Sequence, residues 1–157
     1  MILSSGELKI PCTLLAPEEE KVRRLVLGVH GLGGSMTDEI QTGIAEEMEM
    51  FYGAVLRFDF PAHGESPLGK DGFTLPNCRE SLLTAARWLR ERYPLVEDLC
   101  IFATGFGAYV TLLVLEELVA MPGKVKLVVQ TPSLRMHETI LAMKQITAPT
   151  LQAMERV

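Results

Sequence analysis

The chain has 157 residues, enough for one domain with a substantial core and too few for two ordinary ones. Its formal net charge is -5 and its Lys and Arg residues form no cluster, which argues against nucleic acid or an anionic membrane surface as a partner. Cys12, Cys78 and Cys100 lie far apart without metal-ligand spacing, so we expect reduced thiols in a cytoplasmic protein with no metal and no cofactor.

The first elements are a hairpin and a strand. Residues 2–4 and 8–15, separated by a Ser-Gly turn, predict two antiparallel strands, with Pro11 at an edge because proline cannot donate to a sheet. The short, β-branched run 25–29 predicts a strand that is buried on both faces.

A helix is expected next, with Thr37 or Asp38 as its N-cap and Gly53 after its end. Its apolar residues recur at helical spacing and predict one buried face: Ile40, Ile44, Met48 and Phe51.

Residues 54–58 predict the next strand, and a second helix is expected to open near Thr74 and to end at Pro94. Its predicted buried face consists of Cys78, Leu82, Ala85, Leu89 and Tyr93. Three more elements follow: a strand at 99–103, a helix at 108–121 and a strand at 125–130. This alternation predicts an α/β fold with a mostly parallel sheet, helices on both faces and an N-terminal hairpin.

Three unusual loops follow successive predicted strands, at the end of the sheet where open α/β folds place their sites. The first is His-Gly-Leu-Gly-Gly at 30–34, and the second, at 57–66, contains Asp-Phe-Pro-Ala-His-Gly-Glu-Ser. The third, Ala-Thr-Gly-Phe-Gly at 103–107, has the strand-turn-helix layout of a Gly-x-Ser-x-Gly nucleophile elbow, with Gly105 where serine belongs.

In this order and spacing, the three loops resemble those of the α/β-hydrolase superfamily, and more narrowly the carboxylesterases similar to bacterial cinnamoyl and feruloyl esterases and acylglycerol lipases. The resemblance implies a single hydrolase-like domain without the last two strands of that fold. We expect residues 1–131 to form the sheet and helices, and residues 132–157 to form the start of a cap or a covering tail.

The resemblance also implies the site residues. Gly105 occupies the nucleophile position, and the backbone N–H groups of Leu32 and Phe106 would form the oxyanion hole. The residues expected to support these loops are His30, Gly31, Gly107 and His63.

No nucleophile, acid or base stands at its expected place. His137 is the only histidine after Gly105, and we expect the chain to lack the two strands that would carry the acid and the base. We therefore expect a protein related to carboxylic ester hydrolases that is inactive or severely impaired. Two alternatives remain open: a non-catalytic binding or interaction protein on the hydrolase scaffold, and an esterase with an engineered Ser-to-Gly change that a missing C-terminal part completes.

The expected partner is a small ester or carboxylate ligand. The run 125–130 would be a sheet edge with the composition of a central strand, and such edges invite pairing. The helix at 108–121 is apolar nearly all round. We therefore expect either that the residues after Pro132 cover this surface or that two chains associate there as a homo-oligomer. No nucleic acid and no membrane are expected as partners.

Overall fold

The computed structural model describes residues 1–132 and 135 and contains one six-stranded sheet. Its strands are β1 (Ile2–Ser5), β2 (Leu8–Leu15), β3 (Arg24–Val29), β4 (Gly53–Phe58), β5 (Asp98–Thr104) and β6 (Lys124–Gln130). Their order is β1-β2-β4-β3-β5-β6; β2 is antiparallel to β1 and β4, whereas β3, β4, β5 and β6 run parallel. The mostly parallel sheet with an N-terminal hairpin is confirmed.

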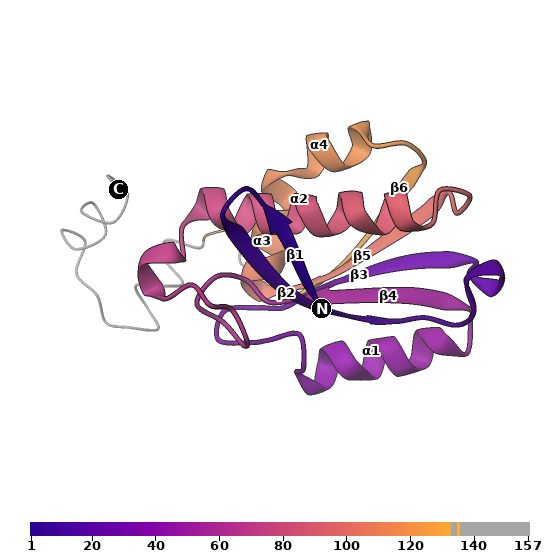
Figure 1. The fold of residues 1–157 in the computed structure, drawn as a ribbon, viewed down its shortest axis with the longest axis horizontal. Helices are drawn as coiled ribbons and strands as arrows, with labels where there is room; N and C mark the ends of the chain where they lie inside the picture. Colours follow the sequence, from indigo (N-terminus) through magenta and orange to yellow (C-terminus); the bar gives the residue numbers. More distant parts are fainter. Residues whose placement is uncertain (133–134, 136–157) are drawn as a thin grey trace.

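Helices cover both faces of this sheet. They are α1 (Glu39–Glu49), α2 (Leu75–Arg92), α3 (Gly105–Leu113) and α4 (Leu115–Ala120), with the short 3₁₀ turns η1 (Glu19–Lys21) and η2 (Lys70–Gly72). Figure 1 shows α1 on one side of the sheet and α2, α3 and α4 on the other. The four parallel strands, each preceded by a helix or turn, end at the same edge and bring their loops together there.

The placement of Pro11 at a sheet edge is wrong, because β2 lies between β1 and β4. Pro11 faces Ile2 at the last β1 pair, and pairing with β4 begins one residue later, at Cys12. The Pro11 carbonyl accepts a hydrogen bond from the Asp59 N–H. Proline is tolerated in this inner strand because Pro11 lies just outside the β2–β4 register, so its missing N–H costs at most one bond at the end of that ladder.

The buried face of α1 also differs from the expectation. Of the four predicted residues, Ile44 and Met48 pack partly against the sheet, whereas Ile40 and Phe51 are half exposed, at 50% and 51%. The fully buried residues of the helix are Gln41 and Ala45. The small Ala45 side chain packs with Val26 and Val55 of the sheet, which lets the helix approach closely. The helix is thus rotated by about one residue from the face that its large apolar side chains predict.

The expected face of α2 is confirmed. Thr74 is the N-cap, and its hydroxyl oxygen accepts a hydrogen bond from the Asn77 N–H at 3.3 Å. All five predicted core residues are at most 6% exposed: Cys78, Leu82, Ala85, Leu89 and Tyr93. The helix packs against the sheet and against α3, and it contributes a large share of the main core.

The single helix expected at 108–121 is two helices. Val114 leaves helical geometry, with φ -109° and ψ 17°, and separates α3 from α4. Val110, Val114 and Leu118 are all fully buried in the main core, so the core-facing side of the chain continues across the break. The two helices still leave Leu112 and Val119 exposed.

Strand β6 stands at the end of the sheet, as expected, and pairs with β5 alone among the described residues. Val128 and Val129 of this strand are 50% and 38% exposed. The expected covering tail and His137 lie outside the described residues, apart from Pro132 and Arg135.

Candidate functional site

The candidate site lies where β5 passes into α3. Strand β5 ends at Thr104, and α3 begins at Gly105, whose φ of +48° lies in the left-handed region that favours glycine. The Thr104 side chain makes no capping hydrogen bond, so it satisfies none of the first amide groups of α3. The chain therefore makes a sharp strand-to-helix turn at the position where the sequence predicts one.

A side chain at Gly105 would have room. A Cβ atom built there would meet one atom outside its chain neighbours within 4 Å, the Cα of Gly31 at 3.8 Å, which is ordinary van der Waals contact. The positive φ, and not crowding, is what favours glycine here. The same contact places the 30–34 loop, which carries Leu32, beside the elbow.

Gly107 is glycine for the opposite reason. A Cβ atom there would collide with the carbonyl oxygen of His30 and would lie 2.8 Å from the carbonyl oxygen of Val29. The first turn of α3 can therefore approach the end of β3 only because this residue has no side chain.

His30 is 1% exposed, and both ring nitrogens bond to the backbone. Nδ1 lies 2.8 Å from the carbonyl oxygen of Gly31, which can only accept, and Nε2 accepts from the Phe60 N–H at 3.0 Å. The ring is therefore neutral with its proton on Nδ1. Burial lowers the pKa of His30, which favours the same neutral form.

His63 has the same arrangement. Its Nδ1 donates to the carbonyl oxygen of Pro61 at 2.9 Å, and its Nε2 accepts from the Gly33 N–H at 3.0 Å. The second bond joins the 57–66 loop to the 30–34 loop. With both ring nitrogens bonded to backbone, His63 holds the two loops together.

Asp59 joins the 57–66 loop to the segment that follows the 30–34 loop. Its carboxylate is 1% exposed and accepts from the N–H groups of Met36 at 2.7 Å and Glu65 at 2.8 Å. A Cβ atom at Gly64, which has a φ of +49°, would collide with this carboxylate. Ala62 adopts a φ of +61° where the resembled loop has glycine, so the turn keeps a glycine-like backbone.

Aromatic rings fill the space beneath the loops. The Phe106 ring lies 5.6 Å from Phe60 and 5.3 Å from Phe73, centroid to centroid, and His63 lies 5.0 Å from Phe73. These separations are typical of edge-to-face packing. Phe73 could not be predicted to contact Phe106, because it lies more than thirty residues before the elbow in a loop without periodicity.

The structure brings most of the expected site residues to one edge of the sheet: His30, Gly31, His63, Gly105, Phe106 and Gly107. Cys78 and Cys100 do not reach it, since Cys78 is in the α2 core and Cys100 packs near Val26. Within residues 1–132, no three His, Cys, Asp or Glu side chains are grouped to hold a metal ion, and no helix is long and apolar enough to cross a membrane.

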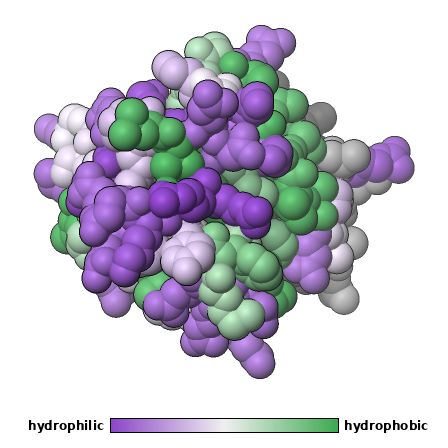
Figure 2. All heavy atoms as spheres, turned by 90° about the vertical axis from the view of Figure 1, so that its right-hand side faces the viewer, coloured by the Kyte–Doolittle hydropathy of each residue, from purple (hydrophilic) through white to green (hydrophobic). Residues whose placement is uncertain are grey.

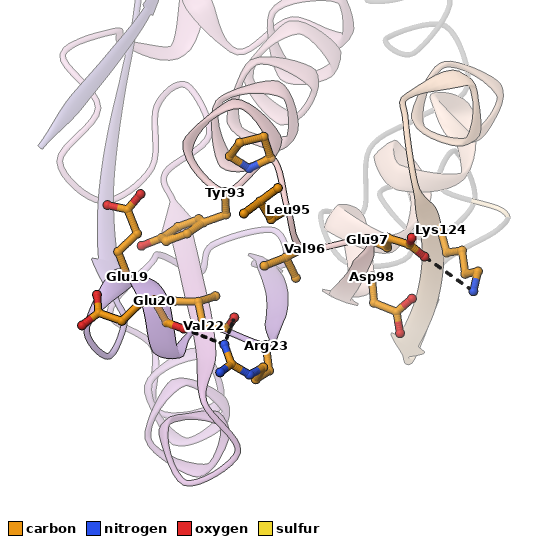
Figure 3. Close-up of a pocket in the computed structure, with 11 residues that line it drawn as sticks. Glu19, Glu20, Val22, Arg23, Tyr93, Leu95, Val96, Glu97, Asp98 and Lys124 are labelled. Carbon is orange, nitrogen blue, oxygen red and sulfur yellow. Dashed lines mark hydrogen bonds and ion pairs between the residues drawn. The ribbon is translucent and has the colours of Figure 1, made fainter.

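A groove of about 840 Å³ lies at the opposite end of the parallel strands, between η1, the loop before β5 and the start of β6. Figure 3 shows Tyr93 and Val96 within it and charged side chains of both signs around it, including Glu97 and Lys124, 3.8 Å apart. Seen from this end, hydrophilic residues cover much of the surface and hydrophobic ones gather along one side (Figure 2). None of the residues that line this groove belongs to the three loops at the carboxyl ends of the strands.

No family model matches the sequence, and comparison with curated proteins also gives no match. Solved structures are similar in fold. An esterase from Pyrococcus furiosus matches over 99% of this chain and 58% of its own, with TM-score 0.74 and 20% identity. A carboxyl esterase from Bacillus coagulans matches over 81% and 42%, with TM-score 0.66 and 17% identity. Est1E from Butyrivibrio proteoclasticus, solved with ferulic acid, matches over 74% and 47%, with TM-score 0.61 and 23% identity.

These likenesses confirm the α/β-hydrolase fold that the three loops predict. The chain spans about half the length of these esterases, between 42% and 58%.

Proposed function

We propose that the chain is related to the carboxylic ester hydrolases of the α/β-hydrolase superfamily and that it binds an ester or carboxylate without hydrolysing it efficiently. The observation that carries this proposal is Gly105, which has the turn geometry and the space of a nucleophile position and no nucleophilic atom. In an enzyme of this kind, removing the serine costs on the order of 10⁶-fold in turnover.

Backbone amides remain when a side chain is lost, and they supply the binding. Leu32 follows Gly31 in the loop that touches the elbow, and Phe106 is in the first turn of α3. Their N–H groups would donate to a carboxylate or carbonyl oxygen, and the N-terminus of α3 favours negative charge there. Each such donor contributes about 2.7–4 kcal/mol to the transition state in enzymes that use it.

Neither histidine of the described loops is free to act as a general base. The ring nitrogens of His30 and His63 are all hydrogen-bonded to backbone groups. To accept a proton, His30 would have to release the Phe60 N–H and His63 the Gly33 N–H. Without a base, a water molecule at the elbow is no better a nucleophile than one in solution.

A titration with butyrate, followed by ¹⁵N–¹H spectra, tests the proposal. We expect the amide signals of Leu32 and Phe106 to shift, and 4-nitrophenyl butyrate to be hydrolysed no faster than without protein. Gly105→Asp places a carboxylate beside the amides and should abolish binding, whereas Gly105→Asn, equal in size and tolerant of positive φ, should retain it. Unshifted amides, or equal effects of the two variants, would contradict the proposal.

An esterase with a replaced serine, completed by a separate C-terminal part, is the alternative. Gly105→Ser separates the two. We expect it to show no ester hydrolysis and no faster labelling by a fluorophosphonate than an ordinary exposed serine. Hydrolysis that appears only after a C-terminal fragment is added would favour the alternative.

We also propose that copies of the chain associate through β6 and the neighbouring helices α3 and α4. The support for this is the exposed apolar surface: Leu112, Leu113, Val119, Val128 and Val129. Exposed edges of this composition are uncommon in monomers. Sedimentation of the chain over a range of concentrations tests it, and a monomer at every concentration would refute it.

A further inference from the structure

The peptide group between Gly31 and Leu32 is held in one orientation. Its carbonyl oxygen accepts hydrogen bonds from His30 Nδ1 at 2.8 Å and from the Gly34 N–H at 3.1 Å. In a trans peptide group the N–H points opposite to the C=O, so the Leu32 N–H points away from both donors. Among residues 1–132 this N–H has no acceptor, and it is therefore available to a ligand.

His63 ties the tip of this loop to another segment. Leu32 and Gly33 are exposed, and a Cβ atom built at Gly33 would meet nothing within 4 Å, so packing does not hold the tip in place. The Gly33 N–H donates to His63 Nε2 at 3.0 Å. Within the described part of the chain, this is the one hydrogen bond that joins Leu32 or Gly33 to a segment outside the loop. Because glycine populates many backbone conformations, the tip would turn readily without that bond.

The His63 ring is itself held on two sides. Its Nδ1 donates to the Pro61 carbonyl oxygen at 2.9 Å, and the ring lies 5.0 Å from that of Phe73, centroid to centroid. The Phe73 ring in turn lies 5.3 Å from the ring of Phe106. One imidazole therefore links the loop of Leu32 to Phe106, the other residue expected to offer its N–H to a ligand.

We propose that His63 is a positioning residue of the ligand site. It acts through Gly33 and holds the Leu32 N–H where this group and the Phe106 N–H bind one carboxylate together. The inference rests on the proposed function and adds the residue that keeps the two donors in register. Donors that are already in place bind more tightly than donors on a loose glycine loop, because the ligand does not have to order them. The feature of His63 that matters is the acceptor at Nε2.

A matched pair of variants tests this role by butyrate titration followed in ¹⁵N–¹H spectra. His63→Gln offers an amide oxygen as acceptor near the position of Nε2, whereas His63→Phe keeps a ring against Phe73 and has no acceptor. We expect His63→Gln to bind butyrate as the wild type does. His63→Phe should bind about 10-fold more weakly, close to the net value of one hydrogen bond, and the shift of the Leu32 signal should fall more than that of Phe106. If His63 served stability alone, the affinities would follow the unfolding free energies of the two variants.

Amide hydrogen exchange of the wild-type chain gives a readout that needs no variant to fold. Gly33 is exposed, so its N–H should exchange slowly only if the bond to His63 persists, and we expect protection there. Unprotected exchange at Gly33 would overturn the inference alone. So would a wild-type affinity of His63→Phe for butyrate, or an equal loss of affinity in both variants. A wild-type chain that does not bind butyrate would contradict the proposed function, and the inference with it.

Discussion

Replacing Gly107 by alanine tests the closest approach in the site. The added Cβ would collide with the His30 carbonyl oxygen and would lie 2.8 Å from both the carbonyl oxygen and Cγ1 of Val29. The chain at Val29 has little room to retreat, because β3 is bonded to β4 on one side and to β5 on the other. Overpacking of this kind costs about 1–3 kcal/mol, and with two backbone oxygens involved we expect the upper half of that range.

Urea unfolding followed by circular dichroism measures this cost, with the slope m expected to be unchanged. A loss of about 2–3 kcal/mol corresponds to a fall in Tm of about 4–12 °C for a domain of this size. The matched control is Gly43→Ala, where a Cβ meets nothing within 4 Å inside α1, and it should stabilise by about 0.5–1 kcal/mol. An unfolding free energy for Gly107→Ala within 0.5 kcal/mol of wild type, roughly the noise of additivity, would refute the close approach.

Three further results are expected. Gln41→Met should stabilise the protein by about 1 kcal/mol in urea unfolding, because both amide atoms of this buried side chain lack a partner among the described residues. A lower unfolding free energy for the variant would indicate that Gln41 makes a hydrogen bond. Burial lowers the pKa of His30 in the folded state, so its stabilising contribution is present above about pH 6.5 and is lost as the pH falls toward the folded pKa. His30→Gln should flatten this part of the plot of unfolding free energy against pH, and an unchanged plot would contradict the burial argument. Burial raises the pKa of the Cys78 thiol to about 12, so in the native protein at pH 8 iodoacetamide should modify it far more slowly than in urea; equal rates would show that α2 opens readily.

Much of the local geometry of the candidate site could be predicted, because its signals lie within a few residues of one another. The turn at Gly105 and the small residue at Gly107 follow from a strand that runs directly into a helix, and both positions have the expected backbone. The bonds that hold the loops together could not be predicted. Asp59 contacts Met36, and His63 contacts Gly33, across more than twenty residues, and nothing in either loop alone specifies its partner.

The succession of strands and helices along the chain, the cap at Thr74 and the buried face of α2 could all be read from the sequence, because they depend on periodicity and on groups a few residues apart. Three features depend on how the elements pack together: Pro11 lies in an inner strand, Gln41 is buried while Ile40 is exposed, and Val114 divides a helix. In each case the outcome depends on how closely separate elements approach. A local pattern specifies a helix or a strand, whereas the side chain that faces inward is set by the surface against which the element packs.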